Sequence, residues 1–342
     1  MDGERVMRAA VIDRYGPPEV FSLREVEKPV PGDSEVLIRI HAALATPSDC
    51  AMRSAKPFII RFFSGLLRPK WGILGDSVAG EVHAVGRDVS RFKVGDRVVG
   101  STGLENGAYA EYCTVSEDAA LTVVPAGQSF AEAVSICEAF LTALPFLRDE
   151  ARLKGGERLL VNGASGSIGA CAVQLGRHFG AEVTGVCSGR NVAMVAALGA
   201  NRVVDYTASD FTAEEGRYDV IFDAVGKTSF SRSARALSPT GLYMTTVPTM
   251  EIARLMLTGS KKSRGKRALL ATTGLRPVAD KAKDLVLMNE LVETGVLRAV
   301  IDRHYRLDQM ADAHRYVETG RKRGSVVIDV AEPAAREGRT SV

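Results

Sequence analysis

Residues 159–169 read Leu-Leu-Val-Asn-Gly-Ala-Ser-Gly-Ser-Ile-Gly, and this stretch decides the fold. An apolar run typical of a buried strand leads into a glycine-rich turn with the spacing GxxGxxG, and the turn opens a helix. The first glycine permits a tight turn, the second lets the backbone approach a pyrophosphate, and the third lets helix and strand pack closely. Amide groups at the positive end of the helix would face the phosphates. We assign this phosphate-binding turn to Gly163, Ala164, Ser165, Gly166, Ser167, Ile168 and Gly169.

The sequence around the turn completes a βαβ unit. Apolar residues recur at helical spacing from Ile168 to Phe179, and Gly180 predicts the end of that helix. Strands and helices then continue to alternate, which favours an α/β fold with a doubly wound parallel sheet of the Rossmann type. The predicted strands are 159–162, 183–187, 202–205, 219–223, 242–247 and 268–272.

The end of the second strand indicates which nucleotide is bound. An NAD site usually places Asp or Glu there, to accept a hydrogen bond from the ribose 2′-hydroxyl. Residues 187–191 read Cys-Ser-Gly-Arg-Asn, and Glu182 lies before the strand, at the wrong end. Ser188 can donate to a phosphate, and Arg190 can pair with a 2′-phosphate. We predict NADP(H) as the cofactor; the alternative is that Arg190 is a solvated residue at the start of a helix.

Composition limits the protein class. The chain has 342 residues, 46% of them hydrophobic, which is enough for two domains with their own cores. A net charge of +3 gives no nucleic-acid footprint, although five basic residues cluster within 261–267. Five scattered cysteines without a CxxC pair are typical of a reducing compartment. We see neither a signal peptide nor an apolar stretch long enough to span a membrane, and we expect a cytoplasmic protein.

The first 125 residues differ from the nucleotide-binding part. They are rich in β-strand patterns and turns, with strands predicted at 7–12, 35–43, 78–85 and 97–100. Residues 131–148 predict a helix that leads into the nucleotide strand. After the basic cluster, helices are predicted at 278–293 and 308–318, and a last strand at 325–330.

Taken together, these stretches resemble the medium-chain dehydrogenase/reductase superfamily. The resemblance is carried by 75–82 with Val85-Gly86, 92–98, 107–112, Thr142-Ala143, 163–169 and 321–327. It implies a GroES-like catalytic domain over 1–128 and a Rossmann NADP-binding domain over 129–272. A C-terminal return over 273–342 would partly join the catalytic domain. The resemblance also implies a homodimer.

One departure from the superfamily pattern concerns zinc. Alcohol dehydrogenases of this superfamily bind catalytic zinc through Cys, His and Cys. The matching positions here hold Thr46, Asp76 and Glu138, while Cys50 and Cys137 stand slightly out of place. The cysteine-rich lobe for structural zinc is also absent from the sequence. We therefore predict no metal site, and the chain looks like the zinc-independent quinone oxidoreductases and enone reductases.

Without a Lewis acid, conjugated acceptors are the easier substrates for hydride transfer. We predict NADPH-dependent reduction of a small apolar quinone or α,β-unsaturated carbonyl. Thr46 is our candidate ligand for the substrate oxygen; the alternative is that it caps a helix beginning at Pro47. Asp76 and Glu138, if close together, would hold a proton, since neighbouring carboxyls raise one another's pKa. Tyr109 is interpreted as a packing residue.

Further coenzyme contacts follow from the resemblance. Thr142 is expected at the nicotinamide and Tyr206 beside the adenosine phosphate. Val225 and Val247 lie at the ends of two later strands, where the ligand cleft of such a sheet is expected.

Two other functions and one segment stay open. The chain could be a metal-dependent NADP alcohol dehydrogenase with unusual ligands, or a non-catalytic NADPH-binding sensor. The apolar segment 56–71 contains three phenylalanines and the single tryptophan. We favour a lid over an apolar substrate for it; the alternatives are a helix packed on the core and a membrane-touching patch.

Overall fold

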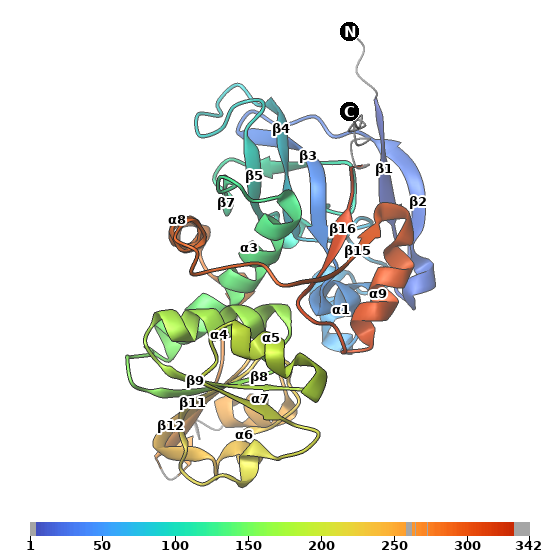
Figure 1. Ribbon diagram of the computed structural model, residues 1–342. Coiled ribbons are helices and arrows are strands. Elements are labelled where there is room, and N and C mark those ends of the chain that lie inside the picture. Colours follow the sequence, from blue (N-terminus) through green and yellow to red (C-terminus); the bar gives the residue numbers. More distant parts are fainter. Residues whose placement is uncertain (1–4, 258–261, 264, 272, 332–342) are drawn as a thin grey trace, which may run out of the picture. The chain divides into compact units, whose positions relative to one another are not determined.

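The computed structural model describes residues 5–257, 262–263, 265–271 and 273–331. The chain forms two compact units. Unit 1 contains the residues up to Cys137, then Val278–Val286, and the residues from Ile301 onward. Unit 2 contains Glu138–Pro277 and Leu287–Val300. Two helices, α3 (Phe130–Leu144) and α8 (Val278–Glu293), each continue from one unit into the other (Figure 1).

Unit 2 is built on a seven-stranded sheet with the order β10-β9-β8-β11-β12-β14-β13. All its pairs are parallel except β13 with β14, which confirms the predicted doubly wound sheet. The strands are β8 (Arg158–Asn162), β9 (Glu182–Cys187), β10 (Arg202–Asp205), β11 (Tyr218–Asp223), β12 (Leu237–Thr245), β13 (Lys262–Ser263) and β14 (Lys266–Leu270). The helices that lie wholly in this unit are α4 (Ser167–His178), α5 (Val192–Ala197), α6 (Phe230–Ser233) and α7 (Met250–Leu257).

The strand order places the ligand edge of this sheet. From β8 the chain continues to β9 on one side, while β11 pairs with β8 on the other side. In open α/β sheets, ligands bind at the carboxyl ends of the strands where the order reverses in this way. The residues that follow β8, β9 and β11 are therefore the ones positioned to meet a nucleotide.

Some element boundaries differ from those predicted. The strand predicted at 242–247 ends at Thr245, because the Thr245 hydroxyl accepts the Val247 amide and turns the chain. Glu182 is the first residue of β9 rather than preceding it, although it still lies at the amino end. The helix predicted to 148 ends at Leu144 and continues as a π-helical segment, Pro145–Glu150. Proline lacks an amide hydrogen, so the regular helical hydrogen bond is lost there.

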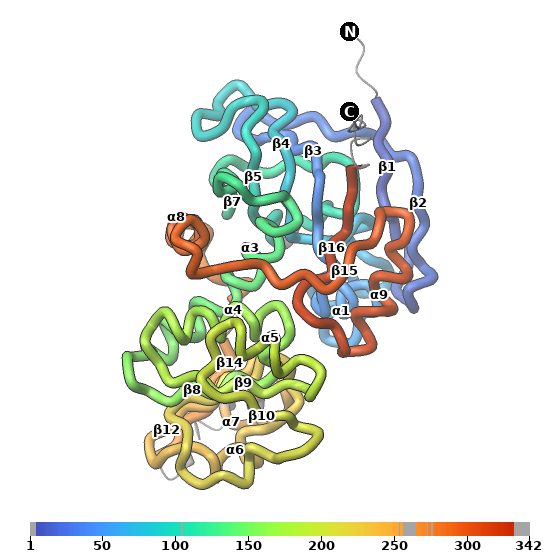
Figure 2. The backbone as a smooth tube through the Cα atoms, in the orientation of Figure 1, coloured from blue at the N-terminus to red at the C-terminus, as the bar shows by residue number. Residues whose placement is uncertain are grey.

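Unit 1 is built around β3 (Glu35–Leu44), which pairs with three other strands. Its main sheet has the order β15-β16-β3-β4-β5-β7, and β6 also pairs with β3. These strands are β4 (Ser77–Val85), β5 (Arg97–Ser101), β6 (Tyr112–Ser116), β7 (Leu121–Val123), β15 (Ile301–Arg306) and β16 (Ser325–Asp329). A separate antiparallel pair consists of β1 (Val6–Val11) and β2 (Ser22–Glu27). Figure 2 shows β16, drawn in red, beside β3, drawn in blue.

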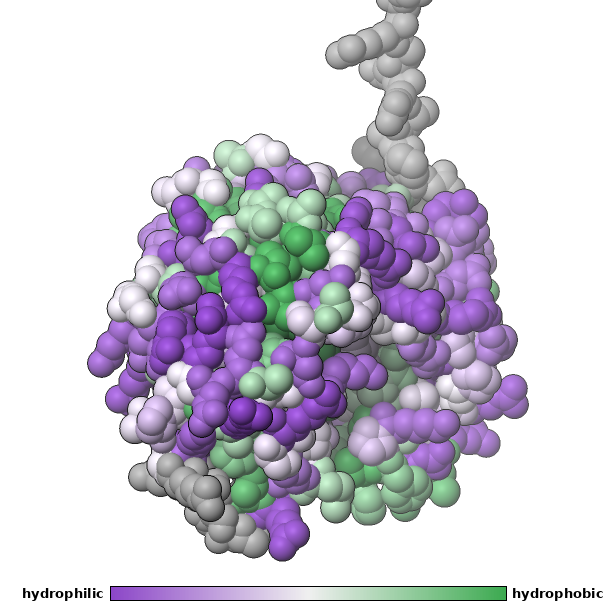
Figure 3. Space-filling model, turned by 60° about the horizontal axis from the view of Figure 1, so that its bottom comes forward, coloured by the Kyte–Doolittle hydropathy of each residue, from purple (hydrophilic) through white to green (hydrophobic). Residues whose placement is uncertain are grey.

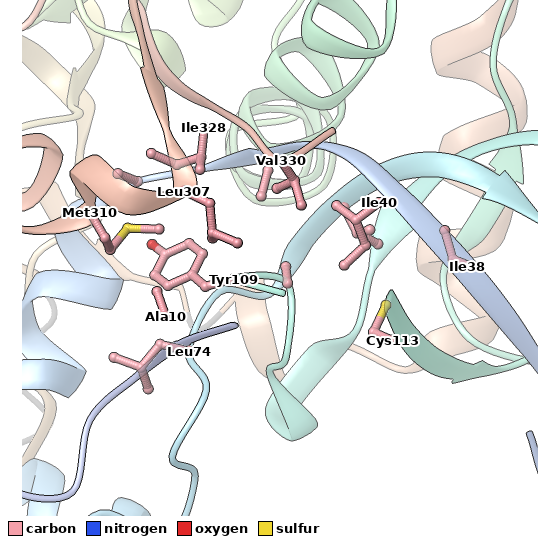
Figure 4. Close-up of a cluster of buried hydrophobic side chains, with 14 of the residues drawn as sticks. Ala10, Ile38, Ile40, Leu74, Tyr109, Cys113, Leu307, Met310, Ile328 and Val330 are labelled. Carbon is pink, nitrogen blue, oxygen red and sulfur yellow. The ribbon is translucent and has the colours of Figure 1, made fainter. Parts of the chain in front are cut away.

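Three helices complete unit 1: α1 (Pro47–Ser54), α2 (Arg61–Ser64) and α9 (Met310–Glu318). The core brings together residues that are distant in the sequence, as Figure 4 shows for Leu74, Tyr109 and Met310. Tyr109 is fully buried, and its hydroxyl donates to the Leu44 carbonyl at 3.0 Å. A Cβ atom on Gly75 would lie 2.7 Å from the Tyr109 ring, so this position requires glycine. The packing role predicted for Tyr109 is confirmed.

One described helical stretch, Phe130–Glu150, is long and apolar enough to cross a membrane by length and composition. Its most apolar window is 67% buried inside the protein, as in the core helix of a globular domain. Of the basic cluster, Lys261 and Arg264 lie outside the described residues. Lys266, the first residue of β14, donates to the carbonyl of Ala234. This contact anchors the start of the strand.

Candidate functional site

The turn after β8 is fixed by backbone hydrogen bonds to the neighbouring strand. The amides of Gly163 and Ala164 both donate to the Val186 carbonyl, at 3.1 and 3.0 Å. The Gly166 amide donates back to the Gly163 carbonyl at 3.0 Å. Gly163 has a φ of +81°, in the left-handed region that favours glycine. The strand, the tight turn and the helix start lie where the sequence predicts them.

The other two glycines of the turn differ in what surrounds them. A Cβ on Gly169 would lie 2.1 Å from the Gly163 carbonyl oxygen, so α4 can approach the turn only without a side chain there. A Cβ on Gly166 would meet one protein atom, the Gly163 oxygen, at 3.5 Å. Protein packing therefore does not require glycine at Gly166, whereas close approach of a ligand would. Gly166 is also the N-cap of α4 and provides no side-chain acceptor for the helix amides. These features fit a pyrophosphate.

Asp223, at the end of β11, organises the next loop. The side chain is fully buried and both of its oxygens accept hydrogen bonds. Oδ1 accepts from the Asn162 side chain at 3.0 Å and from the Val225 and Gly226 amides at 3.2 and 3.0 Å. Oδ2 accepts from the Thr228 amide and the Tyr243 hydroxyl, each at 3.1 Å.

This loop brings together three residues that the sequence predicts at the coenzyme site, namely Gly163, Val225 and Val247. The Val225 side chain occupies the space where a Cβ on Gly163 would stand, and Val247 does the same at Gly226. Val225 and Val247 are 40% and 38% exposed, so both present apolar surface at the carboxyl edge of the sheet. The strand ends of β8, β11 and β12 therefore converge on one place.

The ends of β9 and β10 form a second group of predicted residues. Ser188 accepts a hydrogen bond from Asn191, whose side-chain nitrogen also lies 3.1 Å from the Ser165 hydroxyl. Asn191 therefore links the phosphate turn to the segment that carries Arg190. The Arg190 side chain is exposed, and Tyr206 is 62% exposed on the segment after β10.

Asp205 is an acid in this region that the sequence analysis missed. A Cβ on Gly189 would lie 2.5 Å from Asp205 Oδ2, so the carboxylate stands against the loop of Ser188 and Arg190. Hydrogen bonds from the Thr207 amide and hydroxyl, at 2.9 and 2.8 Å, lower the pKa of Asp205. The dinucleotide-binding motif predicts an acid at the end of the second strand, whereas Asp205 ends the third.

In unit 1, Thr46 forms a capping box at the start of α1. Its hydroxyl lies 2.6 Å from Asp49 Oδ2 and accepts the Asp49 amide at 3.2 Å, while Asp49 Oδ2 accepts the Thr46 amide at 2.9 Å. Pro47 occupies the first helical position. The capping interpretation of Thr46 is confirmed. The Thr46 side chain is engaged with Asp49, and contact with a substrate oxygen stays a prediction.

Asp49 has a strongly altered acidity. The carboxyl is 4% exposed, and burial together with the nearby Asp76 raises its pKa to about 7. Burial also raises the pKa of Asp76, although the Ser77 hydroxyl donates to Asp76 at 3.0 Å and opposes the shift. Two carboxyls that disfavour each other's charge hold a proton at higher pH than either would alone. Asp49 is thus a carboxyl partner for Asp76 that the sequence analysis did not single out.

A neutral hydrogen-bonded chain lies behind this pair. His314 is fully buried, and burial lowers its pKa to about 3. Its Nε2 lies 3.3 Å from the Tyr109 hydroxyl, and its Nδ1 lies 3.4 Å from Cys50 Sγ. Since Tyr109 donates its proton to Leu44, we assign the imidazole proton to Nε2, and Cys50 then donates to Nδ1. Burial raises the pKa of Cys50 to about 12, so the thiol keeps its proton.

The remaining predicted residues belong to unit 2. The Thr142 hydroxyl donates to the Glu138 carbonyl at 3.1 Å, one helical turn back along α3. Glu138 and Asp76 lie in different units, so the proposed contact between them stays a prediction.

The residues at the zinc positions do not fit a zinc site. Thr46, Asp76 and Glu138 offer a hydroxyl and two carboxyls where zinc prefers thiolate and imidazole. Among the described residues, no three His, Cys, Asp or Glu side chains are placed to hold one metal ion. Cys50, which stands close to the first ligand position in the sequence, is instead engaged with His314.

Comparison with known proteins identifies the family. The chain is 30% identical over 328 residues to a quinone oxidoreductase of Pseudomonas aeruginosa, covering 92% of this chain and 97% of the relative. The chain belongs to the quinone oxidoreductase-like branch of the medium-chain dehydrogenase/reductase superfamily. Two family models match this oxidoreductase, an alcohol dehydrogenase GroES-like domain at residues 32–126 and a zinc-binding dehydrogenase domain at residues 198–328.

Solved structures support the same assignment for this medium-chain oxidoreductase. A quinone oxidoreductase from Coxiella burnetii is 31% identical, with a TM-score of 0.84, and the match covers 95% of this chain and 100% of that one. A mycobacterial protein solved in complex with NADPH is 26% identical, with a TM-score of 0.79, over 95% of this chain and 100% of that one. The predicted superfamily and the predicted combination of GroES-like and Rossmann folds are confirmed.

Proposed function

We propose that this oxidoreductase transfers a hydride from NADPH to a quinone or an α,β-unsaturated carbonyl without zinc. The observation that carries the proposal is the turn at 163–169, where Gly166 has space that protein packing does not explain. Similarity to quinone oxidoreductases supports the acceptor class. When bound, the nicotinamide would supply the hydride. The residues of this chain would bind the coenzyme, orient the acceptor and protonate the product.

The choice of NADPH rests on charge near the ribose. Arg190 offers a guanidinium to a 2′-phosphate, and Ser188 offers a hydroxyl. Asp205 is the residue that opposes this assignment, because a carboxylate beside the same loop could instead accept from a ribose hydroxyl. Asp205 Oδ1 accepts both Thr207 hydrogen bonds, and the Gly189 backbone also donates to this carboxylate, so the protein itself already uses it as an acceptor.

Reduction of a conjugated carbonyl also needs a proton, because the hydride leaves negative charge on oxygen. We propose that the Asp49–Asp76 pair holds this proton, since Asp49 keeps its proton up to about pH 7. The Thr46 hydroxyl, 2.6 Å from Asp49, would connect the pair to the substrate oxygen. Charge that spreads over a conjugated acceptor needs no Lewis acid, so carboxyls at the zinc positions are compatible with turnover.

The first experiment measures coenzyme consumption by chelator-treated protein with quinones, enones and simple aldehydes, using NADPH and NADH in parallel. We expect turnover with NADPH and conjugated acceptors only. Turnover that appears only after zinc is added would favour the metal-dependent alcohol dehydrogenase. NADPH binding without turnover on any acceptor would favour the sensor.

A pair of variants tests the coenzyme choice separately. Arg190→Ala should raise KM for NADPH on the order of tenfold or more and leave KM for NADH unchanged, because one ion pair to a phosphate is lost. Asp205→Asn should leave NADPH turnover intact. Loss of NADH turnover in Asp205→Asn, with no effect of Arg190→Ala, would reverse the assignment.

Two expectations concern the whole protein in solution. We propose that it forms a homodimer, as the resemblance implies, and analytical ultracentrifugation would test this. A cytoplasmic location is also our proposal, in keeping with five cysteines that are all free.

A further inference from the structure

The segment between α1 and β4 contains an apolar surface that the proposed reaction does not use. We call residues 58–67 the apolar tip. Six of its large side chains are more than half exposed: Phe58 60%, Ile59 60%, Phe62 71%, Phe63 74%, Leu66 54% and Leu67 85%. On the molecular face drawn in Figure 3, hydrophobic residues form separate areas within a largely hydrophilic surface. Large exposed apolar clusters of this kind mark interaction sites.

The backbone of the apolar tip is held in place. The Tyr15 hydroxyl donates to the Gly65 carbonyl at 2.7 Å and lies 2.8 Å from the Ser64 hydroxyl. Ser64 is buried, and its carbonyl accepts the Lys70 amide at 2.6 Å. The Arg61 guanidinium stacks over the Tyr15 ring at 4.8 Å. The tip therefore presents its apolar side chains from a fixed base and is not a helix packed on the core.

The segment that carries the apolar tip is basic. Five basic residues and no acidic residue lie between Asp49 and Asp76. Lys56, Arg68 and Lys70 among them are exposed. Asp13, the acid that interacts with Arg68, is already paired with Arg24. Exposed Phe and Leu ringed by Lys and Arg match the boundary between anionic headgroups and acyl chains of a lipid surface.

We propose that the apolar tip is a peripheral docking surface for a bilayer that contains anionic lipids. The aromatic and aliphatic side chains enter the headgroup boundary, and Lys56, Arg68 and Lys70 contact lipid phosphates. A lid over an apolar acceptor explains the phenylalanines but gives no role to the exposed Lys56, Arg68 and Lys70 beside them. The inference does not depend on the proposed acceptor or coenzyme.

The test uses the full chain with phosphatidylcholine vesicles, with and without phosphatidylglycerol, in a flotation assay at low and physiological salt. We expect binding to the anionic vesicles that weakens as salt rises. The double variants Phe62→Ser with Phe63→Ser, and Arg68→Gln with Lys70→Gln, should each weaken binding roughly tenfold or more. The matched control is Val30→Ser with Val94→Ser, two loop valines that are 85% and 61% exposed elsewhere in unit 1.

Circular dichroism and thermal unfolding show that each variant keeps the fold and the stability of wild type. Wild-type protein that does not float with anionic vesicles overturns the proposal. Equal loss in the valine control also overturns it. A higher KM for apolar acceptors in the phenylalanine variant, without any vesicle binding by wild type, assigns the tip to a substrate lid instead. Self-association that depends on Phe62 and Phe63, again without vesicle binding, assigns it to a second copy of the chain.

Discussion

At the scale of single residues, the glycines of the phosphate turn are required for two different reasons, close packing of the backbone and space for a ligand. Gly169 lacks a side chain because the Gly163 carbonyl fills that space, whereas Gly166 faces almost no protein atom. The sequence predicts all three glycines by their spacing, but it cannot tell which one serves packing and which one serves a ligand. That distinction depends on atoms brought in by the turn itself.

This difference gives the first prediction. Gly166→Ala should leave thermal stability nearly unchanged and weaken NADPH binding on the order of tenfold or more, because the methyl group would occupy the place of the phosphates. Gly169→Ala should lower the free energy of unfolding by about 2–4 kcal/mol through a backbone clash. Calorimetry and coenzyme titration on both variants measure the two effects. Equal loss of stability in both variants would contradict our view of Gly166.

Asp49 gives a second residue-scale prediction, on pH. Its pKa is 3.8 in an ordinary setting and about 7 in the fold, so the folded state binds more protons than the unfolded state between these values. Stability should therefore fall as pH rises from about 4 to about 7. The side chain of Asp49→Asn cannot ionise and keeps an acceptor for the Thr46 amide. Above pH 7 the free energy of unfolding of this variant should therefore exceed that of wild type by up to a few kcal/mol.

Urea unfolding at a series of pH values measures this effect. The control is Asp308→Asn, since Arg306 lowers the pKa of that exposed carboxyl and moves its titration below the window. If the free energy of unfolding of Asp49→Asn falls with pH as steeply as that of wild type, another group causes the pH dependence.

At the scale of elements, the sequence predicts best those helices and strands whose signal lies in neighbouring residues. The strand 202–205 and the helix 278–293 lie at their predicted bounds, because a βαβ repeat and a helical period are written in neighbouring residues. The sequence pattern does not indicate the strands β2, β6, β7, β13 and β15. Strand β15 reads Ile-Asp-Arg-His-Tyr-Arg and is mostly polar, so only its pairing with β16 identifies it. The Asp49–Asp76 pair was missed for the same reason, since α1 and β4 meet only in the fold.

Strand β11 ends at Asp223, which we expect to serve both stability and coenzyme binding. Asp223→Asn would place an amide donor against the Thr228 amide or the Asn162 side chain, because each oxygen already accepts from a donor. We expect a loss of about 1–3 kcal/mol in the free energy of unfolding. KM for NADPH should rise as the loop of Val225 and Gly226 loosens.

The control lies in the same strand. Asp219→Asn removes a partly exposed ion pair with Arg158 at the other end of β11 and should cost at most about 1 kcal/mol. It should not change KM for NADPH. A rise in KM for Asp219→Asn as large as that for Asp223→Asn would mean that any damage to β11 weakens coenzyme binding.

At the scale of the whole molecule, unit 1 is assembled from distant parts of the chain, while most of unit 2 is continuous. Val327 of β16 pairs with Leu44 of β3, and its side chain is fully buried. We expect Val327→Ala to destabilise unit 1 by about 1–3 kcal/mol and to reduce amide protection in β3 and β15. Hydrogen exchange followed by mass spectrometry should show unchanged protection in the phosphate turn of unit 2. Equal loss of protection in both units would indicate that the protein unfolds as a single cooperative body.

The pairing of β16 with β3 also has a consequence for synthesis on the ribosome. Strand β3 is made early, and β4 can soon pair with one edge of its residues 42 and 43, but β16, the partner for the other edge of residues 42–44, is made only after the whole of unit 2. During that interval a nascent chain carries an unpaired apolar strand edge, which is a template for misassembly with other chains. Unit 2 can meanwhile complete most of its sheet. The order of translation therefore exposes unit 1, rather than unit 2, to the need for a chaperone.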